Sequence, residues 1–150
     1  MKVVILDFDG VIVTPRTRFR SPDPTTIPHL KKILEETDAK IVISSAWRIT
    51  RSLKELRDIL WLAGIEKELV IDVTPRTVNL GGLRVDCGGN RGQEIQAWLD
   101  LHPEVEAFVI LDDDTFDLQD HGEKVVETEM EEGLTIHNAN KAIAILNGEA

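Results

Sequence analysis

The sequence has very little cysteine and no long apolar run at its start. Cys87 is the only cysteine, so the chain can form no internal disulfide, and no Cys or His pattern suggests a zinc site. Near the N-terminus only residues 3–6 are consecutively apolar before Asp7 intervenes, which is too short for a signal-peptide core or a membrane span. We therefore expect a cytoplasmic protein without a membrane partner. No Ser- or Gly-rich linker divides the chain, so a single domain over residues 1–150 is expected.

Positive charge is scarce in the last third of the chain. The protein has 17 Lys and Arg against 27 Asp and Glu, a formal net charge of −10. Residues 1–99 hold 15 basic and 13 acidic side chains, whereas residues 100–150 hold 2 and 14. An anionic substrate is therefore expected to contact the first two-thirds of the chain. The acidic third is most simply a solvated surface.

Short apolar, β-branched segments alternate with amphipathic ones. The apolar segments predict strands that are buried on both faces of a parallel sheet, at 2–6, 40–43, 69–71, 107–111 and 124–126. Helices are predicted between them: Thr26 caps one that ends at Thr37, Thr50 caps one that Gly64 stops, a third covers 92–101, and Asn138 caps one over 139–146.

This alternation predicts an α/β fold with a five-stranded parallel sheet flanked by helices. In such sheets, ligands bind at the carboxyl ends of the strands. Two stretches, residues 10–26 and 72–91, are predicted to be long loops, and loops of that length in a compact domain are usually functional or mobile.

Carboxylate pairs follow two of the predicted strands. Asp7 and Asp9 come directly after the first strand, and alternate residues of an extended chain share a face, so both can address one ligand. Asp112 and Asp113 follow the fourth strand. Carboxylates this close repel one another unless a cation or proton intervenes, and carboxylate oxygens suit Mg²⁺. The pattern predicts a magnesium site, although either pair alone is also compatible with an ordinary acidic turn.

Hydroxyl and basic side chains lie at further element ends. Ser44 and Ser45 follow the second strand, with Arg48 shortly after them, and Arg91 precedes the third helix. A hydroxyl at a strand end can donate to an anionic oxygen, and a cation beside helix-terminal N–H groups can neutralise phosphate. Each residue alone is more often a cap or a surface side chain, so this interpretation depends on their combination.

The order of these segments resembles the haloacid dehalogenase (HAD) superfamily. Its members have a strand followed by Asp-x-Asp, a strand ending in Ser or Thr, a Lys or Arg before a helix, and a strand ending in paired acids. The present chain has ILDFDGV, IVISS, NRGQEI and FVILDDDTFD in that order. The resemblance implies a Rossmann-like HAD core and a Mg²⁺-dependent phosphomonoester hydrolase that works through an aspartyl phosphate.

The resemblance also implies roles for the matching residues. The implied catalytic set is Asp7 as nucleophile, Asp9 as general acid and base, Ser44 as a ligand of the phosphoryl oxygens and Arg91, where most members have Lys, as a stabiliser of charge. The implied Mg²⁺ ligands are Asp7, Asp9, through its backbone carbonyl, Asp112 and Asp113. The residues expected to bind substrate are Gly10, Ser45, Arg48, Arg16 and Arg76.

The loops indicate the class of substrate. Neither insertion point of the HAD core holds more than a short loop, so we expect no large cap domain and an open site. Arginines are frequent in loops near the predicted strand ends, and with Phe19 they predict a cationic rim for a nucleic-acid end that carries a 3′- or 5′-phosphate: Arg16, Arg18, Arg20, Arg48, Arg51, Arg76 and Arg84. The segments SSAWR, RGQEIQAWL and ILDDD also resemble phosphatase modules of RNA-repair proteins. These arginines can equally pair with acids elsewhere on the surface.

Three other functions compete with this hypothesis: a receiver-type phosphoacceptor module, a capless HAD phosphatase of small metabolites, and a non-catalytic relative that binds a partner. A receiver carries its acceptor on a middle strand and lacks an acid two residues later, whereas Asp7 follows the first strand and is accompanied by Asp9. A non-catalytic relative explains the acidic pairs poorly, because unpaired like charges are destabilising unless they bind something.

Overall fold

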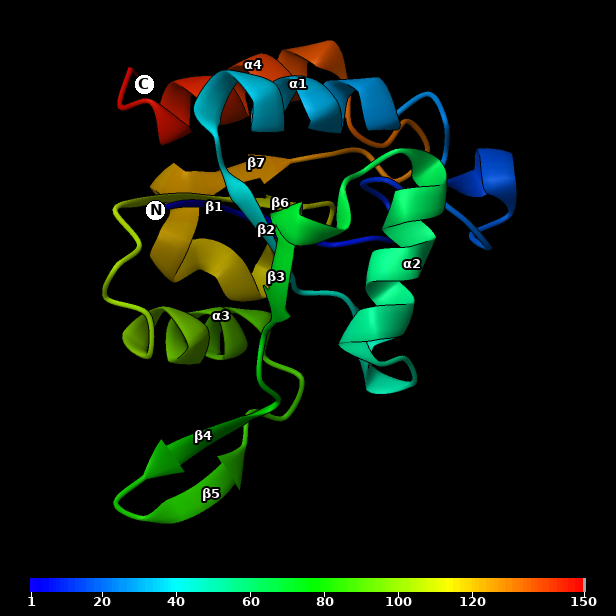
Figure 1. Ribbon diagram of the computed structural model, residues 1–150. Helices are drawn as coiled ribbons and strands as arrows, with labels where there is room; N and C mark the ends of the chain where they lie inside the picture. The colour runs from blue at the N-terminus through cyan, green and yellow to red at the C-terminus, as the bar shows by residue number, and fades with distance from the viewer. Residues whose placement is uncertain (150) are drawn as a thin grey trace.

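A five-stranded parallel sheet forms the centre of the protein (Figure 1). The computed structural model describes residues 1–149. The sheet has the order β3-β2-β1-β6-β7, from strands β1 (Lys2–Leu6), β2 (Lys40–Ile43), β3 (Val70–Val73), β6 (Ala107–Asp112) and β7 (Val125–Glu127). All neighbouring pairs run parallel. The predicted five-stranded parallel sheet is therefore confirmed.

Alternating side chains of the strands build an apolar layer on each face of the sheet. From β1, Val4 and Leu6 belong to a core shared with α1 (Ile27–Thr37), α2 (Leu53–Ala63) and α4 (Ile136–Leu146). Val3 and Ile5 belong to a second core, with α3 (Arg91–Asp100) and the 3-10 helix η4 (Phe116–Lys124). Figure 1 shows α1 and α4 above the sheet and α3 below it. Burial on both faces explains why these strands are continuously apolar.

Two helices begin where a reciprocal cap forms rather than at the predicted residue. Ser52 and Glu55 form a capping box at the start of α2. The cap is therefore Ser52 and not Thr50, the residue that was predicted. Thr135 caps α4, and Asn138, the predicted cap, is the third residue of the helix and completes the box. In each case the helix starts at the residue whose side chain satisfies the free backbone N–H groups.

The segment 72–91, predicted to be a loop, contains an antiparallel hairpin. Strand β4 (Thr77–Leu80) pairs with β5 (Leu83–Asp86), and Gly81 and Gly82 between them both have positive φ. Two residues with positive φ are what a tight two-residue hairpin turn requires. The hairpin projects beyond α3, away from the sheet (Figure 1). Residues 1–149 contain no further large domain, as expected for a core without a cap.

Asp23 organises the other long loop, residues 10–26. Its buried carboxylate accepts hydrogen bonds from Thr14 Oγ1 (2.6 Å), Arg16 Nη1 (2.9 Å) and the backbone N–H of Thr25 (2.9 Å). Burial opposes ionisation, but these bonds hold the pKa of Asp23 at about 2, below its usual 3.8. The Thr26 hydroxyl donates to the Asp23 carbonyl (2.8 Å), so Thr26 does not cap α1 with its side chain.

Three short 3-10 helices complete the described chain: η1 (Pro15–Thr17), η2 (Ala46–Ile49) and η3 (Lys67–Leu69). The first two follow β1 and β2, at the end of the sheet where α2 and the loop 10–26 lie (Figure 1). Within residues 1–149 no helix has the length and apolar character that crossing a membrane requires.

Candidate active site

Parallel pairing brings three polar side chains to one edge of the sheet. The central strand β1 lies between β2 and β6. The backbone N–H of Asp7 donates to Leu111 O (3.1 Å), and that of Ser44 donates to Leu6 O (2.8 Å). Asp7, Ser44 and Asp112 therefore lie side by side at the carboxyl ends of their strands, although they are far apart in the sequence. This edge is where ligands bind in open α/β sheets.

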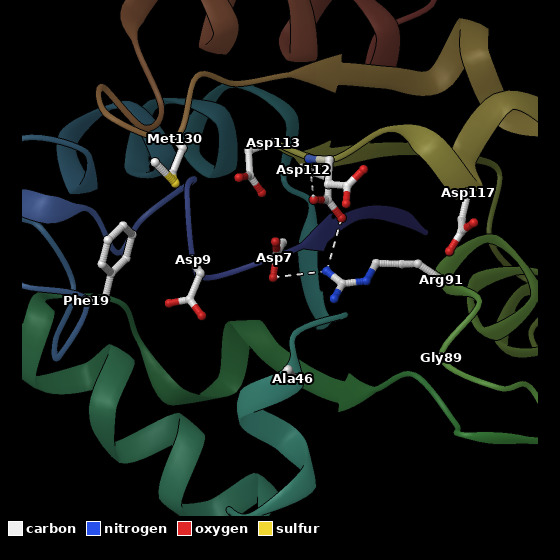
Figure 2. A pocket seen from close by; sticks show the side chains of 11 residues that line it. Asp7, Asp9, Phe19, Ala46, Gly89, Arg91, Asp112, Asp113, Asp117 and Met130 are labelled. Atoms are coloured by element: carbon white, nitrogen blue, oxygen red, sulfur yellow. Dashed lines mark hydrogen bonds and ion pairs between the residues drawn. The ribbon is translucent and has the colours of Figure 1, made fainter.

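A cavity of about 310 Å³ opens at this edge, and its wall is strongly acidic (Figure 2). Five of its lining residues are aspartates from the ends of β1 and β6, while Arg91 reaches it from the first turn of α3. The lining residues are Asp7, Asp9, Phe19, Ala46, Gly89, Arg91, Asp112, Asp113, Asp114, Asp117 and Met130. The structure thus brings together both predicted acidic pairs and the predicted cation.

The donor set of this cavity suits a hard divalent cation. One carboxylate oxygen each from Asp7, Asp112 and Asp113 lies within 4.8 Å of the others. Three carboxylates so close can be ionised together only with a cation among them, and Mg²⁺ prefers oxygen ligands of this kind. The Asp9 side chain is not part of this cluster.

Asp7 is the most perturbed group in the cavity. Burial, together with the nearby Asp112 carboxylate, raises the pKa of Asp7 from 3.8 to about 8, although Arg91 opposes the rise. Burial and Asp112 also raise the pKa of Asp113. A cation beside these groups would favour their ionised forms. The raised pKa values of Asp7 and Asp113 therefore indicate that positive charge nearby would stabilise their ionised forms.

Arg91 supplies part of that charge. Its Nη1 lies 3.1 Å from Asp7 Oδ1 and 3.1 Å from Asp112 Oδ2, as the dashed lines in Figure 2 show. Asn90 caps α3 through a bond from Gln93 N–H, and Arg91 is the first residue of that helix. The cation thus lies at a helix N-terminus, where backbone N–H groups also favour an anion.

Asp9 is held by Trp47, a residue to which the sequence analysis assigned no role at the site. Trp47 Nε1 donates a 3.1 Å hydrogen bond to Asp9 Oδ1, and the Trp47 ring packs against Phe8 with centroids 5.2 Å apart. Trp47 comes from η2, directly after the serines that follow β2. Its place directly after the serine pair is a signal in the sequence that could have pointed to this site.

The two serines after β2 have different roles. Ser44 is buried, and its Oγ has no hydrogen-bond partner among residues 1–149, so it can donate to an incoming oxygen. Ser45 Oγ accepts from the backbone N–H of Trp47 (3.2 Å) and caps η2. In the structure Ser45 therefore has a local capping role, and its role in substrate binding stays a prediction.

Gly10 lets two acidic segments approach each other. It has φ +82°, and a Cβ at this position would collide with the Asp113 carboxyl group. Its carbonyl accepts a 2.6 Å hydrogen bond from Thr128 Oγ1, beyond β7. The Asp-x-Asp-Gly turn therefore depends on glycine both for its conformation and for the close contact.

Two arginines predicted to bind substrate do not line the cavity. Arg48 is buried in an ion pair with Glu94 (2.8 Å) and donates to Thr74 O (2.9 Å), which ties η2 to α3 and to the residue that follows β3. Arg16 pairs with Asp23 (2.9 Å) and Glu132 (3.0 Å). Both guanidinium groups are already engaged by carboxylates, and the role of these two arginines in substrate binding stays a prediction.

Three further polar residues, Arg76, Asp114 and Asp117, differ in how they lie relative to the cavity. Arg76 is exposed at the base of the hairpin and does not line the cavity. Asp114 Oδ1 accepts from the backbone N–H of Phe116 (3.1 Å), which gives it a local turn role. Asp117 faces the cavity from the first turn of η4, opposite Asp9 and Phe19 in Figure 2.

Comparison with known proteins agrees with this geometry. Residues 3–139 match the family described as the HAD domain in Swiss Army Knife RNA repair proteins. No curated protein and no solved structure matches the chain. The matched range includes every residue that lines the cavity.

Proposed function

This chain belongs to the family of HAD domains of Swiss Army Knife RNA repair proteins, and on that premise we propose that it is a Mg²⁺-dependent phosphatase of nucleic-acid ends. Membership of the family supports phosphatase chemistry. One observation carries the finer proposal: Asp7 shares a cavity with two further carboxylates, Asp112 and Asp113, and with the cation of Arg91. We also propose a cytoplasmic location, because the one cysteine is free and a reducing compartment keeps thiols in that form.

In the first step, Asp7 attacks the phosphorus of the substrate. A bond forms between an Asp7 carboxylate oxygen and phosphorus, the bond to the leaving oxygen breaks, and Asp9 gives that oxygen a proton. In the second step, Asp9 takes a proton from water and the water oxygen attacks phosphorus. The bond between Asp7 and phosphorus breaks, which releases inorganic phosphate and restores the Asp7 carboxylate. The covalent intermediate replaces one difficult displacement by two easier ones.

Ser44 and Arg91 are the residues proposed to hold the transferring phosphoryl group. The buried, unpartnered Ser44 Oγ is available to donate to one oxygen, and Arg91 can neutralise charge on the others. Asp7, Asp112 and Asp113, with the Asp9 carbonyl, would hold Mg²⁺. When bound, the ion supplies positive charge that lets a carboxylate approach a phosphate dianion.

The proposed substrate is a phosphorylated strand end. The cavity is open, and residues 1–149 include no large domain that would enclose a small metabolite. The family description names RNA repair, which also favours a nucleic-acid end. A substrate panel of 3′-phosphorylated and 5′-phosphorylated oligonucleotides, mononucleotides and sugar phosphates would rank these classes by kcat/KM.

The reaction itself is tested with p-nitrophenyl phosphate. We expect phosphate release that needs Mg²⁺, stops with a chelator, and falls at least about a thousandfold in Asp7→Asn because the nucleophile is lost. Asp120→Asn, which changes an exposed aspartate of η4, is the matched control. Activity that persists in Asp7→Asn, or that needs no metal, contradicts the proposal. A stable phosphoprotein without turnover after treatment with acetyl phosphate would favour a receiver-type phosphoacceptor.

A further inference from the structure

A second cavity lies beside the candidate active site and differs from it in character. It has a volume of about 530 Å³ and lies between the loop 20–27 and α2. Its wall is mainly apolar, with Pro22, Ile59 and Leu62 among its residues, and two arginines, Arg20 and Arg51, stand beside this surface. We call this cavity the α2 groove.

The α2 groove adjoins the active-site cavity through residues that are neighbours in the chain or hydrogen-bonded to one another. Trp47 lines the groove with its ring while its Nε1 donates to Asp9, which lines the active site. Phe19 lines the active site, and the next residue, Arg20, lines the groove. Figure 2 shows Asp9 and Phe19 on the side of the active-site cavity away from Arg91. A ligand that leaves the cavity past Asp9 therefore meets the groove next.

Arg20 and Arg51 both line the groove, and neither forms an ion pair among the described residues. Among residues 1–149, Arg16, Arg48 and Arg91 form ion pairs, whereas the other arginines, these two included, form none. The Arg51 guanidinium instead lies over the Trp47 ring, 4.3 Å from its centroid. In a protein with a net charge of −10, a groove lined by two arginines and by no acidic residue fits an anionic ligand.

We propose that the α2 groove binds the single-stranded RNA that carries the phosphate to be removed. This inference rests on the proposed function, in which Asp9 protonates the leaving oxygen. The leaving group is then the RNA itself, and it must lie on the Asp9 side of the phosphorus. Trp47 links Asp9 directly to the groove, so the nucleosides next to the reacting phosphate enter it.

The chemistry of the groove fits this ligand. Nucleobases bind to apolar and aromatic surfaces and stack on guanidinium planes, while the phosphates between them need cations. The α2 groove offers both, with Trp47, Ile59 and Leu62 as apolar surface and Arg20 and Arg51 as cations. A phosphopeptide is the competing occupant of the groove, and the experiment below distinguishes it from RNA.

The test measures binding without turnover. In an Asp7→Asn background, the affinity for a fluorescent hexauridylate with a 3′- or 5′-phosphate is followed by anisotropy. Leu62→Glu places a negative charge at a leucine that is 80% exposed, and Arg20→Glu reverses an exposed cation of the groove. We expect each to weaken RNA binding by roughly tenfold or more. Leu62→Glu removes an apolar contact with a base, and Arg20→Glu removes a contact with a phosphate.

Two substitutions outside the groove are matched controls. Leu101→Glu changes a leucine that is 74% exposed at the end of α3, and Lys141→Glu reverses an exposed cation of α4. Both should bind RNA within about twofold of the Asp7→Asn parent, since surface changes away from a site have small effects. In the active protein, hexauridylate with a terminal phosphate should have a higher kcat/KM than uridine monophosphate.

The outcomes separate this inference from the proposed function. Equal RNA affinity in all four variants overturns the proposal that the α2 groove binds RNA, even if the protein is an active phosphatase. A phosphopeptide whose binding depends on Leu62 and Arg20, while RNA binding does not, also overturns it. The protein could also bind RNA through the groove and hydrolyse no phosphomonoester. That result supports RNA binding in the α2 groove and contradicts the proposed phosphatase activity.

Discussion

Trp47 and Asp9, 38 positions apart in the sequence, are joined by a 3.1 Å hydrogen bond from the indole Nε1 to the carboxylate Oδ1. The Trp47 ring is buried against Phe8, so the bond links the proposed acid and base to the rigid core. Only one Asp9 oxygen is engaged, and the other remains available to the substrate. The bond orients Asp9 and leaves it able to transfer a proton.

Trp47→Phe should impair proton transfer to the leaving oxygen. Phenylalanine keeps a buried ring but removes the N–H, so Asp9 loses its orientation. We expect kcat for phenyl phosphate, a poor leaving group, to fall by roughly tenfold to a hundredfold. The fall for p-nitrophenyl phosphate should be smaller, because that leaving group needs little protonation.

Trp98→Phe is the matched control for this prediction. Trp98 is also buried, and its Nε1 donates to an aspartate, Asp72 (2.8 Å), outside the cavity. This variant should lower thermal stability without changing the ratio of the two rates. Equal losses for both substrates in Trp47→Phe would show that Trp47 acts only on stability.

Asp112→Asn should remove the response of the protein to Mg²⁺. Asp112 contributes an oxygen to the acidic cluster and also pairs with Arg91. We expect Mg²⁺ to raise the melting temperature of the parent by a few degrees (roughly 3 °C), since a bound ligand stabilises the folded state. The shift should vanish in Asp112→Asn, together with at least about a hundredfold of the activity. An unchanged shift would place the ion elsewhere.

Gly10→Ala should disturb both the turn and the acidic cluster. The added Cβ meets the Asp113 carboxyl group at a residue with φ +82°. We expect a loss of about 1–3 kcal/mol in the free energy of unfolding, measured by urea denaturation, and a weaker Mg²⁺ response. Gly122→Ala is the control, because no atom lies within 4 Å of its Cβ position and its φ isn't positive. Equal stability of the two variants would refute the steric argument.

Asp23 should make the stability of the protein depend on pH in the acid range. Its pKa is about 2 in the folded protein and 3.8 ordinarily, so the folded state binds the proton less readily than the unfolded state. The resulting stabilisation is complete above pH 4 and is lost as the pH falls toward 2. We expect Asp23→Asn to cost about 1–2 kcal/mol at pH 6 and much less at pH 2, measured by thermal unfolding.

Asp58→Asn provides the comparison for Asp23. Asp58 also pairs with a cation, Lys67 (2.9 Å), but both side chains are about half exposed. Solvent screens such pairs, so this substitution should change the free energy of unfolding by less than about 0.5 kcal/mol at either pH. A pH-independent loss in Asp23→Asn would mean that its hydrogen bonds, rather than its charge, stabilise the loop.

Local patterns explain which parts of the fold could be predicted. Strands β1, β2 and β6 were predicted from their apolar, β-branched runs, and the acidic pairs Asp7/Asp9 and Asp112/Asp113 from their position directly after two of them. The hairpin of residues 77–86 was missed, although Gly81-Gly82 between two four-residue β segments is a local hairpin signal. The capping residues were misplaced by two or three positions, because several Ser, Thr and Asn residues compete near each helix start.

Composition, periodicity and the order of the motifs determined the α/β sheet and the acidic edge, since each depends only on residues close together in the chain. Tertiary packing alone decided which acidic residues each arginine meets. Arg48 and Arg16 pair with Glu94 and Asp23 outside the cavity, Arg91 pairs with Asp7 inside it, and Arg20 forms no ion pair among residues 1–149. The reason is physical: an ion pair forms where helices and loops set two side chains within reach, and for Arg48 and Glu94 that depends on how α3 packs against the sheet.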